Sequence, residues 1–415
     1  METKKYSPNL IICVCSLVYF VSYFARKDFA AVLAGILADG VMDKAAAGLI
    51  GTAMFICYGA GQLISGYLGD RIKPELLMLS GLSATAICNL LMPLVDSPTL
   101  MIFVWGINGL AQAMLWPPIV RILADNLDSE SFVRANLYVT SAAHIATVIL
   151  YIYVPVCLRF FEWRTVFFTA TALTSVAFCI FIALMSKTLF ARRETANDAP
   201  VPQKRDEKTE KYGKLVVASG LISVFFSIIA MGYLRDGIES WLPTLYSEVF
   251  SREASESVLF SAVLPIFSIL SVTVITALHK TRLFDNEVRG SLITFLASIL
   301  LSVPVIFLIN ATSLFLRILC LALSALVAAC MHASNFLLIS CLPGRFARTG
   351  RAATTSGLSN AFTYIGAAVS MYGMGSIADS FGWSAVVISW IAVGALGVVF
   401  SLIALRSYTK FIGEK

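Results

Sequence analysis

The sequence carries little charge for its length. Only 13% of its 415 residues are charged, whereas a soluble globular domain carries about 25%. Hydrophobic residues make up 58% of the chain, and its mean hydropathy is +0.82. This shortage of charge excludes a chain that mostly faces water, and it leaves no room for a sizeable soluble domain.

The sequence also lacks the residue patterns of several functional classes. Its nine Cys residues are scattered through apolar segments without metal-ligand spacing, so we expect no metal site, no disulfide framework and no cofactor. We find no ATP-binding motif, no His-rich metal set and no paired catalytic acids. These absences argue against an enzyme, and we assign no catalytic residue.

What the sequence does have is long apolar runs. A helix needs about 20 mostly apolar residues to cross a membrane. Twelve such segments fill nearly the whole chain and predict an all-α membrane protein with twelve transmembrane helices; the first is too long for a cleaved signal peptide. The segments are 9–37, 45–69, 75–95, 98–123, 134–158, 164–186, 215–247, 257–279, 290–310, 312–341, 352–377 and 384–407.

Lys and Arg residues are concentrated in the loops that would share the side of the N-terminus. The opposite loops hold only Lys44, Arg159, Arg164, Arg252 and Arg317. By the positive-inside rule, this bias predicts a multi-pass protein of the cell membrane with both termini cytoplasmic.

 We expect this membrane to be the inner membrane of a bacterium. The net charge of +6 follows from the same bias and does not indicate nucleic-acid binding.

A polar, Pro-containing segment interrupts the apolar pattern near the middle of the chain. It predicts three parts: an N-terminal six-helix bundle at 1–187, a cytoplasmic linker at 188–213 and a C-terminal six-helix bundle at 214–415. The halves echo each other, because "FFEWRTVFF" precedes the sixth segment and "SFGWSAVVI" precedes the twelfth. Transporters built from two such repeats hold their substrate near the middle of the membrane, between the repeats.

Each half carries an arginine deep inside its first apolar segment. Arg26, followed by Lys27, and Arg235 lie too far from either membrane surface to reach it, and an Arg at a helix centre costs about 2.5–3.5 kcal/mol. In one interpretation Arg26 pairs with Asp28 and Arg235 pairs with Glu239. In the other, which we favour, both arginines line a water-filled cavity and bind an anion. Guanidinium groups match the oxygens of phosphate with paired hydrogen bonds, so phosphate is the expected anion.

Several other polar or aromatic side chains interrupt the apolar segments. Tyr19 and Tyr23 precede Arg26 by seven and three residues, so they share its stripe of the helix. His144 lies near the middle of the fifth segment and can titrate near neutral pH. Further candidates for contact with a substrate are Tyr58, Trp116 and Tyr364.

Short motifs along nearly the whole chain resemble those of the organophosphate:phosphate antiporters, a branch of the major facilitator superfamily. "ARKDF" resembles the family's Arg-Lys-Asn-Phe in helix one, and "LWPP" resembles its Gly-Trp-Pro-Pro in helix four. "YLRDGIESWLPTLYSEV" resembles the arginine segment of helix seven, and "GLSNAFTYIGAAVSMYGMGSIADSFGW" resembles helix eleven. "GYLGDR" resembles the superfamily's loop motif between helices two and three. The resemblance implies the major facilitator fold.

The resemblance also implies roles for individual residues. In the family the two arginines bind phosphate and a helix-five His assists, which maps onto Arg26, Arg235 and His144; Lys27 is included with them. The family's aromatic pocket maps onto Tyr19, Tyr23, Tyr58, Trp116 and Tyr364. Where the family has a Lys in helix two this chain has Gln62, and where a Tyr is usual in helix ten it has His332. Candidates for ion pairing or gating are Gln62, Asp70, Glu239 and His332.

The resulting prediction is a monomeric secondary transporter. It would carry a phosphorylated organic anion of the sugar phosphate or glycerol phosphate class in exchange for inorganic phosphate, by alternating access. Its partners would be these small molecules and the lipid bilayer, with no nucleic acid. Two alternatives stay open: a membrane sensor that binds a sugar phosphate, and a porter for another organic anion. A proton-coupled porter for drugs or neutral sugars is disfavoured, because helices four, eight and ten hold no carboxylate.

Overall fold

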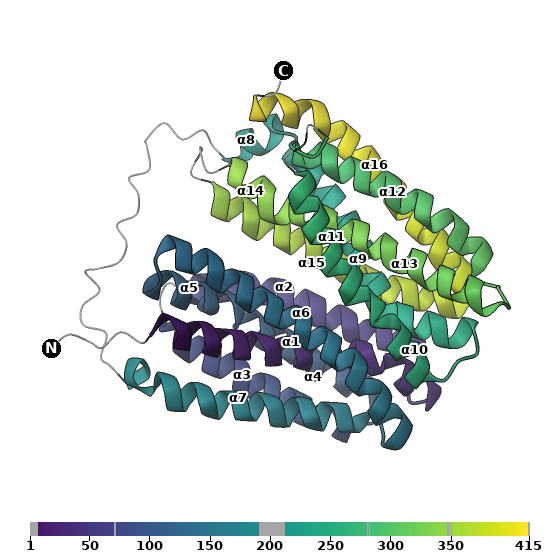
Figure 1. Ribbon diagram of the computed structural model, residues 1–415, viewed down its shortest axis with the longest axis horizontal. Coiled ribbons are helices and arrows are strands. Elements are labelled where there is room, and N and C mark those ends of the chain that lie inside the picture. The colour runs from purple at the N-terminus through teal and green to yellow at the C-terminus, as the bar shows by residue number, and fades with distance from the viewer. Residues whose placement is uncertain are drawn as a thin grey trace. The chain divides into compact units, whose positions relative to one another are not determined.

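The computed structural model describes residues 7–69, 72–190, 212–279, 281, 283–346, 349 and 351–413. Every regular element in these residues is a helix, which confirms the predicted all-α class (Figure 1). Contacts divide the described chain into two compact units. The first unit comprises the residues up to Phe190 together with Ser240–Ile266 and Met371–Ser380, and the second unit comprises the rest.

The helices that precede Phe190 belong to the first unit. α1 packs along α6 and α7, which lie on either side of it in Figure 1. The bounds of these helices are α1 Pro8–Ala38, α2 Lys44–Gly69, α3 Pro74–Leu91, η1 Met92–Leu94, α4 Pro98–Ala113, α5 Trp116–Asn126, α6 Ser129–Phe160 and α7 Arg164–Phe190.

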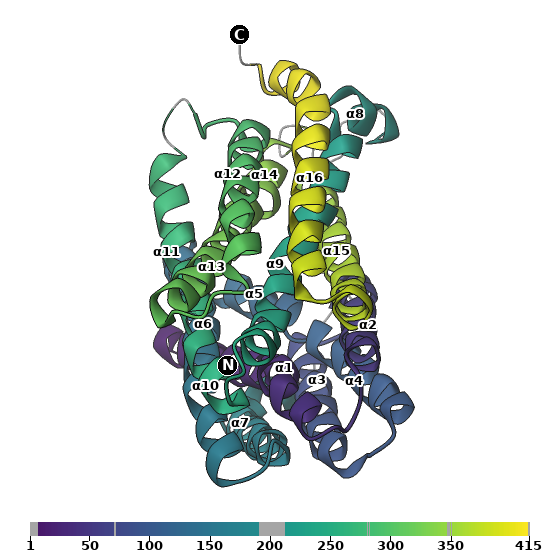
Figure 2. The same ribbon diagram turned by 90° about the vertical axis from the view of Figure 1, so that its right-hand side faces the viewer.

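The later helices are shared between the units. In the second unit α12 packs against α13 and α16 (Figure 2). The bounds of the later helices are α8 Tyr212–Ala218, α9 Leu221–Val249, α10 Ala254–Ser261, α11 Val263–Leu278, α12 Glu287–Leu308, α13 Leu314–Asn335, the π-helix η2 Phe336–Cys341, α14 Leu342–Arg345, α15 Ala352–Phe381 and α16 Trp383–Ile412.

Each predicted span coincides with one helix or with a run of consecutive helices, so the twelve-helix prediction is confirmed. Eleven spans of the described chain are long and apolar enough to cross a membrane. The twelfth is α15, which has 30 residues but is rich in Gly, Ser and Thr. Most of the predicted linker lies outside the described residues.

Local chemistry explains where some of these helices begin and break. Ser7 caps the start of α1, because its side-chain oxygen accepts a hydrogen bond from the backbone N–H of Leu10 at 3.3 Å. The fourth span is broken between α4 and α5 just before Pro117 and Pro118, which have no N–H to donate to the preceding turn. Gly220, with a φ of 73°, separates α8 from α9 in a conformation that favours glycine.

Candidate functional site

Arg26 lies in the middle of α1 and contacts aromatic rings. Its Cζ atom is 4.1 Å from the ring centroid of Tyr23 and 5.1 Å from that of Tyr58, which belongs to α2. Distances of this size place both tyrosines within cation–π range of the guanidinium. The i−3 spacing of Tyr23 from Arg26 explains why the two side chains meet on one face of the helix.

The other predicted aromatics of the first unit continue this group. The ring centroid of Tyr19 is 5.0 Å from that of Tyr23 and 4.8 Å from that of Trp116, the first residue of α5. The structure therefore joins Tyr19, Tyr23, Tyr58, Trp116 and Arg26 into one set, which we call the Arg26 cluster. Half-buried Gln62 follows Tyr58 by one helical turn on α2.

Asp28 does not pair with Arg26, although one interpretation of the sequence allowed it. The Asp28 side chain is fully buried, and its Oδ1 accepts a hydrogen bond from the N–H of Phe29 at 2.8 Å. Its Oδ2 has no hydrogen-bond partner. The position of Asp28, about 200° around the helix from Arg26, accounts for the separation.

Two more predicted site residues of the first unit lie on α1 and α6. Lys27 is half-buried and directly follows Arg26. His144 is half-buried on α6, and its Nδ1 lies 2.8 Å from the carbonyl oxygen of Thr140. Because a carbonyl oxygen only accepts, Nδ1 carries the proton in this contact.

Arg235, in the middle of α9, is held by polar side chains of the second unit. Its Nε donates to Oδ1 of Asp236 at 3.2 Å and its Nη2 donates to Oδ2 at 2.7 Å, so the contact is bidentate. Its Nη1 donates to the side-chain oxygen of Asn335 on α13. Arg235 is 13% exposed and Asp236 is 7% exposed, so this is a mostly buried ion pair.

Glu239 and His332 form a second contact between the same two helices. Oε1 of Glu239 is 2.7 Å from Nε2 of His332. Glu239 follows Arg235 by four residues on α9, and Asn335 follows His332 by three on α13, so both contacts use side chains one turn apart. Tyr364 of α15 lies near enough to Arg235 to interact with it electrostatically.

The sequence-based reasoning missed Asn335 as a partner of Arg235. A signal was present, because Asn335 follows His332 by three residues and shares its face of a mostly apolar segment. The π-helix η2 begins directly after Asn335, and such elements are frequent at functional sites. The gating candidate Asp70 lies outside the described residues.

A charged cluster that the sequence did not predict lies in the first unit, at the start of α2. Nζ of Lys44 is 3.1 Å from Oε1 of Glu248 and 3.2 Å from Oδ1 of Asp379. Oδ2 of Asp379 also accepts a hydrogen bond from the backbone N–H of Ala45 at 2.9 Å. Asp379 therefore binds both the side chain of Lys44 and the N-terminal end of α2, where helices favour negative charge.

Glycines bring α2 and α15 into backbone contact beside this cluster. A Cβ atom added to Gly48 would lie 2.5 Å from the carbonyl oxygen of Met371, and one added to Gly375 would lie 2.5 Å from that of Lys44. Trp241 of α9 donates a hydrogen bond from Nε1 to the same Met371 carbonyl at 3.2 Å. Any larger residue at either glycine would push the helices apart.

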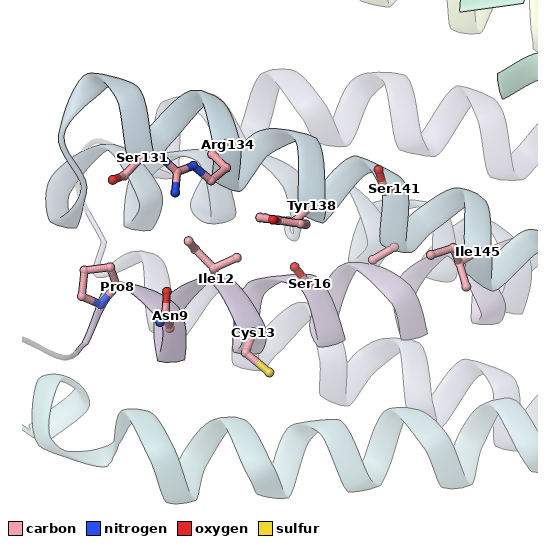
Figure 3. A pocket seen from close by; sticks show the side chains of 11 residues that line it. Pro8, Asn9, Ile12, Cys13, Ser16, Ser131, Arg134, Tyr138, Ser141 and Ile145 are labelled. Carbon is pink, nitrogen blue, oxygen red and sulfur yellow. The ribbon is translucent and has the colours of Figure 1, made fainter. Parts of the chain in front are cut away.

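The first unit also contains a cavity of about 480 Å³ between the starts of α1 and α6 (Figure 3). Its polar lining includes Asn9, Ser16, Arg134 and Tyr138, and none of the predicted site residues lines it. This cavity is therefore separate from the Arg26 cluster.

Comparison with known proteins gives the family of the chain. The profile of the Major Facilitator Superfamily matches residues 15–371, so the chain belongs to this superfamily of membrane transporters. The curated relatives confirm the predicted branch, the organophosphate:phosphate antiporters. The chain is accordingly a multi-pass membrane protein.

The relatives match to different extents. A glycerol-3-phosphate transporter of Bacillus subtilis (strain 168) is 27% identical over 399 residues, which is 91% of this chain and 88% of the relative. A probable hexose phosphate transport protein of Chlamydia trachomatis is 37% identical over 119 residues, 29% of this chain and 26% of the relative. The membrane sensor protein UhpC of Escherichia coli (strain K12) is 34% identical over 119 residues, 29% of this chain and 27% of the sensor.

Solved structures match the fold. The crystal structure of a bacterial homolog of the human lysosomal transporter Spinster aligns with a TM-score of 0.77 over 97% of this chain and 98% of that chain, at 14% identity. An identity this low supports the fold alone. The predicted major facilitator fold is confirmed.

Proposed function

We propose that this protein is a secondary transporter that exchanges a phosphorylated organic anion for inorganic phosphate by alternating access. The observation that carries the proposal is the position of Arg26 and Arg235, each in the middle of a long helix and each held by aromatic or polar side chains. A guanidinium group kept in such surroundings offers paired N–H donors that match phosphate oxygens.

The side chains around the arginines suggest which residues bind each part of the substrate. The phosphoryl group would bind Arg26 and Arg235, with Lys27 adding positive charge and His144 assisting. The organic part would contact the rings of the Arg26 cluster and Tyr364, which offer apolar faces together with phenol hydroxyls. The named relatives favour a glycerol phosphate or a hexose phosphate as the organic substrate.

Alternating access requires contacts that form in one state and break in the other. We assign this role on one membrane face to Lys44 and its partners Glu248 and Asp379. If both termini are cytoplasmic in a bacterial inner membrane, as the Lys and Arg distribution supports, the end of α1 and the start of α2 lie on the outer face. The cluster would then close the outer end of the transport path in a monomer.

Counterflow into proteoliposomes tests the proposed exchange. Purified protein would be reconstituted into vesicles loaded with unlabelled inorganic phosphate, and uptake of labelled phosphate would be followed with glycerol 3-phosphate or glucose 6-phosphate as competitors. Exchange predicts rapid labelled uptake that needs internal phosphate and is inhibited by at least one competitor. Uptake that is independent of internal phosphate would contradict the exchange mechanism.

A sensor is the second candidate, since the Escherichia coli relative is named as one. A sensor would bind a sugar phosphate without moving it across the membrane. Saturable binding of a labelled sugar phosphate to the purified protein, with no counterflow in the same preparation, would favour the sensor. Saturable binding and counterflow of a different organic anion would instead favour a porter for that anion.

A further inference from the structure

Asp28 is a buried carboxyl group for which the proposed transport mechanism has no use. It lies in the middle of α1 and has no exposed surface. Its Oδ1 accepts a hydrogen bond from the backbone N–H of Phe29 at 2.8 Å, and its Oδ2 has no hydrogen-bond partner. Among the described residues, no Lys, Arg or His forms an ion pair with it.

Two buried asparagines at this level of α1 have side-chain oxygens that receive no hydrogen bond. Asn89 of α3 and Asn108 of α4 each donate from Nδ2 to the carbonyl oxygen of Ala25, at 3.2 Å. Ala25 precedes Asp28 by three residues, so the two share a face of α1. The side-chain oxygens of Asn89 and Asn108 are both buried and have no hydrogen-bond donor. Two amide oxygens and one carboxyl oxygen therefore lack a proton to accept.

The charged groups nearest in sequence do not supply that proton. Arg26 is directed to the rings of Tyr23 and Tyr58, and Lys27 lies about 100° around the helix from Asp28. The side chains that α3 and α4 bring to this level are Asn89 and Asn108, which do not titrate. An ionised carboxylate buried with only backbone donors and no cation is strongly unfavourable, whereas a neutral acid both avoids that penalty and supplies a donor.

We propose that Asp28 is a proton-binding site, held as the neutral acid with its Oδ2–H as the donor that the surrounding acceptors lack. One proton is taken from solvent by the carboxylate, and no other bond changes. As a consequence, Asp28 does not cancel the charges of Arg26 and Lys27, and α1 keeps both positive charges in its middle. This inference rests on burial and hydrogen bonding and does not depend on the proposed substrate.

Infrared difference spectroscopy tests the protonation state directly. Spectra of the full chain in liposomes at neutral pH would be compared with those of Asp28→Asn. We expect the substitution to remove the carbonyl stretch of a protonated carboxylic acid and to leave the carboxylate bands unchanged. Loss of carboxylate bands instead would overturn the proposal.

Asp236→Asn is the matched control, because Asp236 also follows an arginine in the middle of a helix but is paired with it. This variant should lose carboxylate bands and keep the protonated-acid band. If Asp28→Asn fails to fold, the wild-type chain labelled with ¹³C in its aspartate carboxyl groups replaces it. Solid-state NMR in bilayers should then show one protonated carboxyl signal that persists at alkaline pH, and its absence would overturn the proposal.

Discussion

Arg26 of α1 and Arg235 of α9 occupy similar places in the sequence, but their neighbours differ chemically. Arg26 contacts the faces of Tyr23 and Tyr58, which attract a cation without neutralising it. Arg235 contacts the carboxylate of Asp236 through two hydrogen bonds, so its charge is already compensated.

The difference teaches that the two arginines would meet an anion under unequal conditions. Removing one partner of a buried ion pair costs about 3–5 kcal/mol, whereas a cation–π contact contributes about 0.5–2 kcal/mol. An incoming phosphate would share Arg235 with Asp236, while at Arg26 it would meet the rings of Tyr23 and Tyr58. Removing Asp236 would therefore destabilise its unit more than removing a ring beside Arg26 would destabilise the other.

The largest expected effect comes from Arg26→Lys and Arg235→Lys, which test whether phosphate exchange needs both guanidinium groups. Lys keeps the charge but loses the planar set of N–H donors, and two charge-assisted hydrogen bonds of about 1.5–3 kcal/mol each are at stake. Each substitution should lower phosphate counterflow at least about a hundredfold. Arg121→Lys, at a partly exposed pair with Asp125, is the control and should leave counterflow near wild type. Wild-type counterflow in either test variant would contradict the assignment.

Asp236→Asn sharpens the comparison by making Arg235 resemble Arg26. Without the competing carboxylate, phosphate should bind about tenfold more tightly, the equivalent of about 1.4 kcal/mol. The unfolding temperature should fall, because a buried arginine loses its counter-ion. Equilibrium binding of labelled phosphate and a thermal unfolding assay measure the two effects. Asp28→Asn is the control for phosphate affinity, which it should leave unchanged; weaker binding in Asp236→Asn would refute the competition.

Lys44→Gln tests whether the Lys44 contacts close one end of the transport path, and we expect its effect on accessibility to be intermediate in size. The substitution removes the cation between Glu248 and Asp379, so the two carboxylates repel each other and the contact opens more readily. A Cys reporter placed at Ala47, which is buried three residues after Lys44 on α2, should be labelled about fivefold faster by a membrane-impermeant thiol reagent. Lys73→Gln is the control at a different loop. An unchanged labelling rate would show that the cluster does not close this end.

The smallest expected effect comes from the rings at Arg26. Tyr23→Leu and Tyr58→Leu remove the aromatic faces, so the apparent affinity for phosphate should change by about threefold to tenfold through altered placement of the guanidinium. Tyr23→Phe and Tyr58→Phe keep the faces and should change it less. Concentration dependence of counterflow distinguishes the two. Equal losses in the Leu and Phe variants would assign the effect to the phenol hydroxyls.

Features that depend on spacing along one helix were predictable from the sequence. Apolar runs of sufficient length gave twelve helices, and the interval of three residues placed Tyr23 against Arg26. The same kind of reasoning offered Glu239 as a partner of Arg235 in the less favoured interpretation, whereas the structure pairs Arg235 with its neighbour Asp236. The flexible arginine side chain folds back onto the adjacent carboxylate, a contact that helical periodicity does not register.

Features that depend on contacts between helices were not predictable from one sequence. Asn335 meets Arg235 across 100 residues, and Ala45 meets Asp379 across 334. Lys44 and Glu248 are 204 residues apart, and in the sequence each is an ordinary loop charge with no sign of its partner. The periodicity of a sequence does not indicate which loops contact each other in the folded chain.

The glycines of α2 and α15 have a mechanical consequence. Because Gly48 and Gly375 carry no side chain, the backbones of α2 and α15 touch at these positions, and the side chain of Met371 packs against Gly51. If α2 and α15 separate during transport, no side chain at Gly48 or Gly375 has to change its rotamer. If these helices separate and meet again during transport, the contact of Lys44 with Asp379 at one end of the interface would restore the same register.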